Sequence, residues 1–246
     1  MKKSHRIFLL LSLLFFVCIF IVSSAILITY YLRRNEESKY IRDIVERFEI
    51  VLPPNSADIC PIKIDFEKLS SQNPDIVAWI YSDTLNINYP VVRGKDNSEY
   101  LHKGFDRNYL FCGTLFVDSM NSRDFSDLNT IIYGHNMQNG TMFNKIGKYR
   151  KQAFYEQNKT IWLLTPHQNY KLLPFSGKIV PHDDESFCIF EDKDSFFDHV
   201  YQSYADSLFK SDVDVTSIEQ IVTLSTCTYE FKNARFVLLC KLQECY

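Results

Sequence analysis

A cysteine at the end of an apolar stretch is the residue of this sequence best suited to covalent chemistry. Residues 221–224 are apolar or β-branched, small hydroxyl residues follow them, and Cys227 comes next. The end of a β-strand holds a side chain in place and still exposes it, so a thiol there can act as a nucleophile. A buried structural cysteine is the alternative interpretation, because free cysteine is among the most buried residue types.

An arginine follows this cysteine after a short interval. Arg235 begins the next apolar stretch, eight positions after Cys227. Two neighbouring strands joined by a short loop would bring the guanidinium group beside the thiol. Because the guanidinium group is always charged, it would favour the thiolate and could stabilise an oxyanion, but it could not transfer protons.

A thiol enzyme also needs a group that carries protons, and His135 is the candidate. It follows the apolar stretch 130–133 and Gly134, so it is also expected at the end of a strand. Isolated histidines are often structural, so only the combination with Cys227 and Arg235 indicates catalysis. The other histidines either precede the N-terminal apolar segment or are expected to be solvated or locally hydrogen-bonded: His5, His102, His167, His182 and His199.

The composition is that of an ordinary globular protein and argues against several classes of function. With 246 residues, of which 46% are hydrophobic and 23% charged, the chain fits one catalytic domain with appendages. A formal net charge of −3 gives no field that would attract nucleic acid, and the 7 glycines form no Gly-rich phosphate loop. The 7 cysteines form no Cys-x-x-Cys pair, so neither a metal site nor a cofactor is expected, and their odd number leaves at least one free thiol.

An uncharged N-terminal segment predicts a membrane anchor. Residues 7–32 contain no charged side chain and are long enough to span a bilayer as a helix. Basic residues flank the segment, and Tyr30 and Tyr31 lie at its far edge, where aromatic side chains meet the membrane surface. A cleaved signal peptide is the alternative, with residues 23–25 (Ser-Ser-Ala) as its cleavage site. The apolar run continues beyond that point, which favours an uncleaved anchor.

The remainder of the chain predicts a mainly β fold. Stretches rich in Val, Ile, Tyr and Phe predict about eight strands: 76–81, 87–92, 114–117, 130–133, 160–164, 170–180, 220–224 and 235–242. Helical patterns occur at 36–50, ended by 53–56 (Pro-Pro-Asn-Ser), from Asp65 to about Asn73, at 142–155 and at 195–209. The last helix has an apolar stripe that we expect in the core: Phe196, Phe197, Val200, Tyr201, Tyr204 and Leu208. Many short strands with few helices favour a closed barrel or a sandwich over a βαβ architecture.

Four parts are therefore expected along the chain. They are a cytoplasmic tail at 1–6, the transmembrane anchor at 7–32, a helical appendage and linker at 33–75, and a catalytic β-barrel domain at 76–246. Three basic residues precede the span and two follow it, so we expect the amino terminus inside the cell and the catalytic domain outside.

Several segments together resemble the signature of the sortase family, and specifically of class B. Residues 223–227 (Thr-Leu-Ser-Thr-Cys) with the later Arg235, and residues 133–137 (Tyr-Gly-His-Asn-Met), carry most of the resemblance. Similar segments occur in the expected order at 73–80, 88–92, 96–101 and 140–143. The resemblance covers about residues 66–242, and the helix at 195–209 before the cysteine strand is a class B trait.

The resemblance implies an architecture and a set of site residues. The implied fold is an eight-stranded β-barrel with an N-terminal helical appendage, a helix inserted before the cysteine strand and a single transmembrane helix. The active site would lie on the extracellular face of the membrane of a Gram-positive bacterium. Cys227, His135 and Arg235 would be catalytic, and the substrate groove would be lined by Asn97, Leu101, Tyr133 and Ser225.

The implied reaction is a transpeptidation. A cysteine thioester would form at a C-terminal sorting signal of a secreted protein, of Asn-Pro-x-Thr or Ser/Pro-Pro-x-Thr type. The acyl group would then pass to an amine of peptidoglycan or of its lipid-linked precursor. Thr228 follows the nucleophile where some relatives carry an acidic residue, which leaves the role of a carboxylate there in doubt. No third residue that would orient His135 is evident, so a papain-like triad is not supported.

Two other functions remain open from the sequence. An extracellular cysteine endopeptidase would use the same thiol with water as the acceptor, and a ligated product formed with an added amine would distinguish the two enzymes. A membrane-anchored binding module on a similar barrel would have a groove without turnover. Such a module has no need for a cysteine, a histidine and an arginine together.

Overall fold

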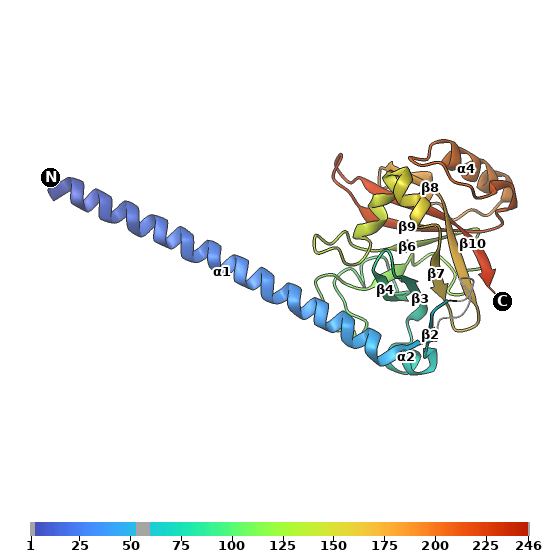
Figure 1. Cartoon of the computed structure of the whole chain (residues 1–246), viewed down its shortest axis with the longest axis horizontal. Coiled ribbons are helices and arrows are strands. Elements are labelled where there is room, and N and C mark those ends of the chain that lie inside the picture. The colour runs from blue at the N-terminus through green and yellow to red at the C-terminus, as the bar shows by residue number, and fades with distance from the viewer. Residues whose placement is uncertain (1–2, 53–59, 246) are drawn as a thin grey trace. The chain divides into compact units, whose positions relative to one another are not determined.

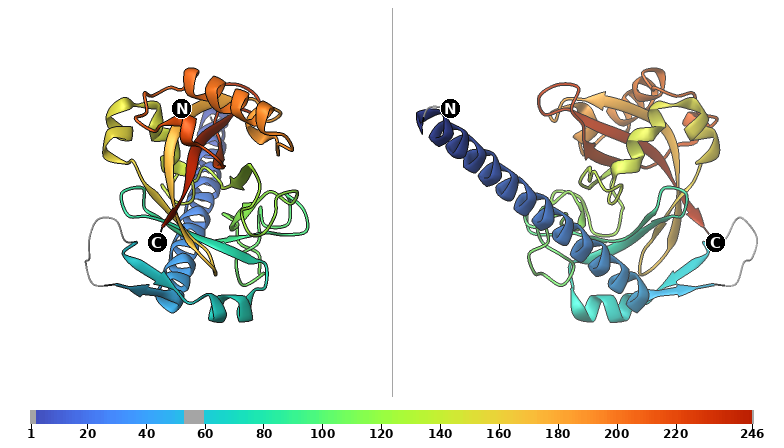
Figure 2. Two further views of the ribbon diagram at one scale, coloured as in Figure 1. Left: turned by 90° about the vertical axis from the view of Figure 1, so that its right-hand side faces the viewer. Right: turned by 60° about the vertical axis from the view of Figure 1, so that its left-hand side comes forward.

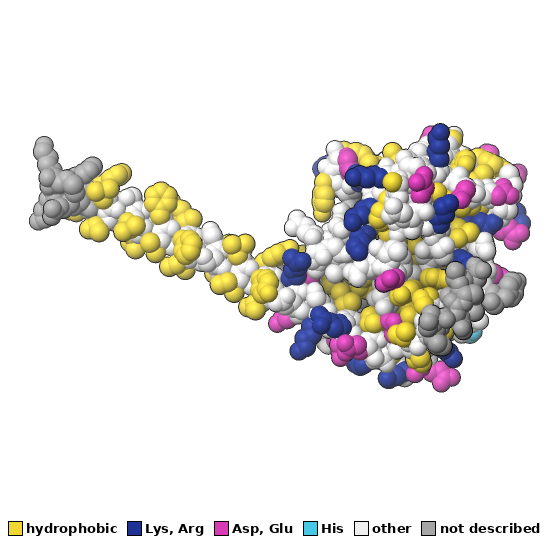
Figure 3. Space-filling view, viewed as in Figure 1, with side chains coloured by type: hydrophobic (Ala, Val, Ile, Leu, Met, Phe, Trp, Pro, Cys, Tyr) yellow, Lys and Arg dark blue, Asp and Glu magenta, His cyan; other side chains and the backbone are white. Residues whose placement is uncertain are grey.

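The computed structural model describes residues 3–52 and 60–245, and the chain divides into two compact units, Met1–Asp43 and Ile44–Tyr246. Helix α1 (Lys3–Phe48) makes up the described part of the first unit and continues into the second (Figure 1). In the described part of the chain it is the one helix long and apolar enough to cross a membrane, and hydrophobic side chains line its first half (Figure 3). The predicted span and the predicted helix at 36–50 are thus one continuous helix, which ends at Phe48.

A short sheet that the sequence did not predict follows α1. Strand β1 (Glu49–Val51) pairs with strand β2 (Ile62–Ile64) in antiparallel register. Each strand has three residues, which is too short for an alternating pattern to be recognised. The predicted helix-ending stretch 53–56 lies outside the described residues.

The second helix begins and ends as predicted. In α2 (Phe66–Gln72), the carboxylate of Asp65 accepts a hydrogen bond from the backbone N–H of Lys68 at 3.0 Å, which caps the first turn. The end of α1 packs against α2, because Nζ of Lys68 lies 5.4 Å from the centre of the Phe48 ring. Phe48 also packs against Phe105, with ring centres 6.0 Å apart, and only 2% of it is exposed. This part of the chain therefore belongs to the second compact unit.

Eight strands close into a barrel in the order β10-β8-β7-β3-β4-β5-β6-β9 (Figures 1 and 2). They are β3 (Ile76–Ser82), β4 (Ile87–Val92), β5 (Leu115–Val117), β6 (Asn129–Tyr133), β7 (Ile161–Leu164), β8 (Asn169–Val180), β9 (Ile221–Cys227) and β10 (Arg235–Cys245). Each strand overlaps a predicted one, and Trp79, Phe175 and Phe236 are among the fully buried side chains of the core. The prediction of a mainly β, eight-stranded barrel is confirmed.

Two strand pairs of the barrel are parallel, and they decide where the ends of the strands meet. β4 pairs with β5 and β6 pairs with β9 in parallel register, whereas the other barrel pairs are antiparallel. Parallel neighbours need a long connection, and β7, β8 and α4 (Lys193–Ala205) all lie between β6 and β9. Because parallel strands run in the same direction, the residues at the C-terminal ends of β6 and β9 lie at the same end of the barrel.

The helices between the strands differ from the prediction in their bounds. The predicted helix 142–155 is divided into a 3₁₀ helix η1 (Asn144–Arg150) and α3 (Gln152–Gln157), because Lys151 between them has extended backbone angles of φ −113° and ψ 125°. Helix α4 ends at Ala205 and not at 209, since the N–H of Leu208 donates to the carbonyl of Gly177 on β8. Two further 3₁₀ turns are η2 (Glu185–Phe187) and η3 (Val215–Ser217).

The buried face of α4 also differs from the predicted stripe. Phe196 and Val200 are buried as predicted, but Tyr201 and Tyr204 are 47% and 38% exposed. The buried face continues instead through Ser203, at the spacing of three and seven positions that one face of a helix requires. Aromatic character was therefore a misleading guide to burial in this helix.

Candidate active site

The neighbouring strands β6 and β9 bring His135 and Cys227 to the same end of the barrel. Their parallel register pairs Tyr133 with Ser225, and His135 and Cys227 each lie two positions beyond this pair. The N–H of Gly134 donates to the carbonyl of Ser225 at 3.0 Å, so the hydrogen bonding continues past the end of β6. A histidine and a cysteine from distant parts of the sequence thus follow one pair of adjacent strands.

Arg235 reaches the same place through β10. The antiparallel register of β9 and β10 pairs Arg235 directly with Cys227, so the two side chains lie on the same face of the sheet. Nη1 of Arg235 donates to the carbonyl of Ala234 at 3.2 Å. No carboxylate of the described residues forms an ion pair with this guanidinium group, which leaves its charge available to a ligand.

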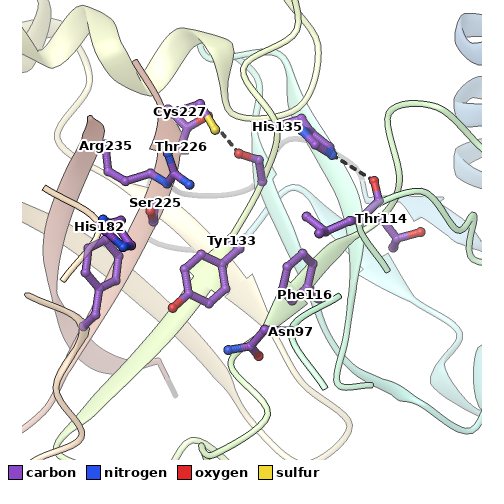
Figure 4. Close-up of a pocket in the computed structure, with 13 residues that line it drawn as sticks. Asn97, Thr114, Phe116, Tyr133, His135, His182, Ser225, Thr226, Cys227 and Arg235 are labelled. Carbon is purple, nitrogen blue, oxygen red and sulfur yellow. Dashed lines mark hydrogen bonds between the residues drawn. The ribbon is translucent and has the colours of Figure 1, made fainter. Parts of the chain in front are cut away.

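One cavity of about 290 Å³ brings together all the site residues predicted from the sequence (Figure 4). They are Asn97, Leu101, Tyr133, His135, Ser225, Cys227 and Arg235. The lining also includes Thr114, Phe116, Gly134, His182, Phe187 and Thr226. Across residues 3–52 and 60–245, no group of three His, Cys, Asp or Glu side chains is placed to hold a metal ion.

The ring of His135 is half-buried, and a hydrogen bond at its edge holds it in place. Its Nε2 lies 2.8 Å from the carbonyl oxygen of Leu101 (Figure 4). Because a carbonyl only accepts, Nε2 carries the hydrogen, and the neutral ring has its lone pair at Nδ1. Burial lowers the pKa of His135, the Leu101 carbonyl opposes this shift, and the positive charges of His102 and Arg235 lower the pKa further. The ring is therefore mostly neutral near pH 7 and can accept a proton at Nδ1.

Two glycines allow the segments around this imidazole to approach closely. A Cβ added at Gly134 would lie 2.4 Å from Cδ2 of Leu115, so a larger residue between the end of β6 and β5 would force neighbouring side chains to move. Gly113 has a φ of +58°, and a Cβ there would lie 2.3 Å from the carbonyl oxygen of Tyr100 and 2.4 Å from that of Leu101. Gly113 thus permits the packing that places the Leu101 carbonyl.

The cysteine end of β9 is also fixed by polar contacts. Nδ2 of Asn136 donates to the carbonyl of Cys227 at 2.8 Å. Nη2 of Arg150 donates to the hydroxyl of Thr228 at 2.6 Å, and the same guanidinium group pairs with Glu230. The chain at and after the thiol is therefore tied to the segment that follows β6 and to η1.

Comparison with known proteins identifies the family. The Sortase domain family matches residues 80–243, which is more than half of the chain. A sortase B of Staphylococcus aureus is 32% identical over 243 residues, a match that covers 98% of this chain and 98% of the relative. The chain belongs to the sortase family. The structure of Clostridium perfringens sortase B is 36% identical with a TM-score of 0.66, and the match covers 72% of this chain and 99% of that one. The Staphylococcus aureus sortase B–substrate complex is 34% identical with a TM-score of 0.68, and the match covers 74% and 85% of the two chains.

Membership of this family confirms the resemblance seen in the sequence. The protein is a class B cysteine transpeptidase, and sortases are enzymes of the cell envelope. They act on proteins that carry a sorting signal and transfer them to an amine of the cell wall. The endopeptidase and binding-module alternatives receive no support from these relatives.

Asp118 connects two of the predicted groove residues of this sortase and was not predicted itself. Its Oδ2 accepts from Nδ2 of Asn97 at 2.7 Å and from the hydroxyl of Tyr133 at 2.9 Å. Burial raises the pKa of Tyr133, and the negative charge of Asp118 raises it further, so the phenol stays protonated. Asp118 directly follows the predicted strand 114–117, and this position at a strand end was the one available signal.

Two histidines that were expected to be solvated or locally hydrogen-bonded lie at the sortase cavity. His182 lines it, and the ring of His102 stacks on the ring of His135 with centroids 5.4 Å apart. Both histidines are exposed, and both lie in loops that no periodic pattern describes. Only the three-dimensional path of these loops brings them to the site.

Proposed function

We propose that this sortase transfers acyl groups with Cys227 as the nucleophile, His135 as the acid and base, and Arg235 as the group that stabilises the oxyanion. The observation that carries this proposal is the meeting, in one cavity, of a thiol, an imidazole and a guanidinium group that forms no ion pair with the described carboxylates. Strand register places Arg235 beside Cys227, and the parallel pair β6 and β9 delivers His135 to the same end. These three groups supply the functions that a thioester mechanism needs.

The first step forms the thioester. The Cys227 thiol gives its proton to Nδ1 of the neutral His135 ring, and the resulting thiolate attacks the carbonyl carbon of a backbone amide in the sorting signal, so that Sγ becomes bonded to that carbon. The C–N bond breaks, and the leaving amine takes a proton from Nδ1 of protonated His135. Arg235 stabilises the negative oxygen that develops between these events, because its charge is permanent and lies at the wall of the cavity.

The second step consumes the thioester. An acceptor amine gives a proton to Nδ1 of His135 and attacks the carbonyl carbon, and Cys227 leaves as the thiolate. A new amide bond therefore replaces the one that was broken, without a cofactor. We infer that the amine belongs to peptidoglycan or to its lipid-linked precursor, which are the acceptors implied by class B membership.

The substrate peptide is proposed to bind along Asn97, Leu101, Tyr133 and Ser225. Ser225 lines the cavity, and its hydroxyl oxygen is buried without a hydrogen-bond partner among the described residues, so its hydrogen-bonding capacity is unused there. Leu101 is 36% exposed and offers apolar surface to a substrate side chain. A sorting motif of Asn-Pro-x-Thr or Ser/Pro-Pro-x-Thr type is the class of substrate that we infer.

The proposed location follows from the N-terminal helix. We infer that residues 7–32 span the cell membrane once, with the tail 1–6 in the cytoplasm and the catalytic domain 76–246 on the extracellular face, joined by 33–75. The length and apolar character of α1 support an anchor. The excess of basic residues before the span supports this orientation.

The experiment that tests the function is a ligation assay with the full chain in detergent. Peptides carrying the inferred motifs are incubated with the protein, with and without oligoglycine or a diaminopimelate-type amine, and the products are mapped by mass spectrometry. We expect cleavage at one bond and diversion of the acyl fragment into an amide with the added amine. Cleavage that proceeds equally well in Cys227→Ala, with Cys245→Ala as the matched control, would contradict the proposal.

A further inference from the structure

A stack of aromatic rings continues outward from the imidazole of His135. The ring of His102 is nearly parallel to the ring of His135, with centroids 5.4 Å apart and an angle of 18°. The same ring stacks with Phe111 at 5.9 Å and 22°, and it contacts Tyr109 at 6.4 Å and 33°. His102 is therefore packed against the face of the one ring to which the mechanism assigns proton transfer.

The plane of His102 is itself fixed by a hydrogen bond. Its Nδ1 lies 2.8 Å from the carbonyl oxygen of Phe111. Because the carbonyl only accepts, Nδ1 carries the hydrogen, and Nε2 is the nitrogen left to bind a further proton. The N–H of Leu110 donates to the carbonyl of His102 at 3.1 Å, so the backbone is held as well.

Two consecutive residues thus contact His135 from two directions. The carbonyl of Leu101 receives Nε2–H at the edge of the imidazole, and the side chain of His102 covers a face. The edge contact fixes which nitrogen carries the hydrogen, but it leaves the ring able to tilt about the hydrogen bond. The stacked ring of His102 restricts that tilt.

We propose that His102 is a positioning residue for His135, which holds the plane of the imidazole in which Nδ1 exchanges protons with the thiol and the amines. This inference rests on the proposed role of His135. His102 is then a second histidine of the site. A positive charge on its ring would repel a positive charge on the ring of His135. Stacking maintains the geometry, and like charge favours the neutral form of His135.

The charge of His102 acts beside other groups that face the cavity. Arg235 from β10 is permanently positive, Tyr133 from β6 stays neutral, and Cys227 from β9 and His182 from the loop after β8 complete the titratable lining. His102 is stacked directly on the imidazole, so a charge on its ring would act on His135 at ring contact.

The test compares two substitutions of His102 in the full chain in detergent. His102→Phe keeps a flat ring for stacking and removes the charge, whereas His102→Ala removes both. His167→Ala, an exposed histidine outside the cavity, is the matched control. The rate of thioester formation on a sorting peptide is measured for each protein, and the imidazole of His135 is titrated by NMR after assignment with His135→Ala.

We expect His102→Ala to slow thioester formation about tenfold through loss of orientation, and His102→Phe to recover most of that rate. Both variants should raise the pKa of His135, because removing a neighbouring like charge favours the protonated ring. His102→Ala at the wild-type rate, His102→Phe no faster than His102→Ala, or an unchanged titration of His135 in both variants would overturn the proposal. Undiminished activity of His135→Ala would instead refute the proposed function on which the inference rests.

Discussion

Cys227 and Arg235 occupy facing positions on two paired strands, whereas His135, across the cavity, lies outside the strands (Figure 4). Leu101, which also lines the cavity, lies outside the strands as well. The cysteine side is fixed by a continuous ladder of backbone hydrogen bonds between β9 and β10. The histidine side depends on separate contacts, chiefly the bond from Nε2 of His135 to the Leu101 carbonyl and the stack with His102.

This difference predicts how substitutions on each side of the cavity affect the site. A strand ladder is made by the backbone, so a substituted side chain on the cysteine side should change the chemistry and leave the geometry intact. On the histidine side, the geometry is made by individual side chains and by two glycines that permit close approach. Substitutions there should therefore change the geometry as well as the chemistry.

The largest expected effect on the histidine side comes from His135→Ala. General acid–base catalysis contributes about a hundredfold to ten-thousandfold, so we expect thioester formation to fall about a thousandfold. The half-buried position should tolerate alanine, so the melting temperature should change little. Rates are measured on a sorting peptide by rapid quench, with His167→Ala as the control, and a loss below tenfold would argue against His135 as the proton carrier.

A smaller loss is expected on the cysteine side from Arg235→Lys. Lysine keeps the charge but lacks the planar fork, so thioester formation should fall by at least about tenfold, or about 1.4 kcal/mol of transition-state stabilisation. Because Arg235 lies on the strand ladder, thermal stability should stay the same. Arg107→Lys, in an exposed pair with Asp75, is the control and should react at the wild-type rate. Equal rates for Arg235→Lys and wild type would make Arg235 structural.

Gly113→Ala should disturb the histidine side without touching any reacting group. The added Cβ would lie 2.3 Å from the Tyr100 carbonyl oxygen at a φ of +58°, so we expect a loss of about 1–3 kcal/mol in stability. The shift of the Leu101 carbonyl should also slow thioester formation about threefold. Gly147→Ala has open space and is the control for both denaturant unfolding and rate. Unchanged stability and rate in Gly113→Ala would show that the close approach is not required.

The smallest effect concerns the pH dependence of stability. Burial lowers the pKa of His135 in the folded protein, so the unfolded chain binds this proton more readily. The resulting stability is present above the ordinary histidine pKa and is lost as the pH falls below it. His135→Gln should therefore lose less stability than wild type between pH 7 and pH 5, as measured by urea unfolding. His199, whose burial lowers its pKa to about 4, titrates in both proteins and cancels in the comparison. Identical slopes would contradict the assigned shift.

Much of the fold was predictable because strands have a local signal. Every barrel strand coincides with a stretch of β-branched and aromatic residues, and Asp65 marked the start of α2 through its capping side chain. The end of α4 was not predictable, because it depends on a hydrogen bond from Leu208 to Gly177 on a distant strand. The sheet of β1 and β2 was missed because three-residue strands carry no periodicity.

The residues of the site also fall into a group that the sequence predicts and a group that it does not. Cys227, Arg235 and His135 could be selected because reactive side chains at strand ends have a recognisable pattern in the sequence. Asp118 also follows a predicted strand, but that position alone did not indicate its role, which lies in the hydrogen bond it accepts from Tyr133. His102 had no such signal, and its role lies in its stack with His135. The conformation of the loops that place such residues is set by tertiary contacts and not by residue spacing.

The central claim is that Cys227 becomes acylated by the sorting signal, and intact-mass spectrometry of the quenched full chain tests it most directly. With a sorting peptide and no amine, the protein should gain the mass of the acyl fragment, and digestion should locate the added mass on the segment that contains Cys227. Hydroxylamine should remove it, as expected for a thioester. The adduct should be absent in Cys227→Ala and unaffected in Cys245→Ala. An adduct that persists in Cys227→Ala, or that maps to another cysteine, would contradict the account.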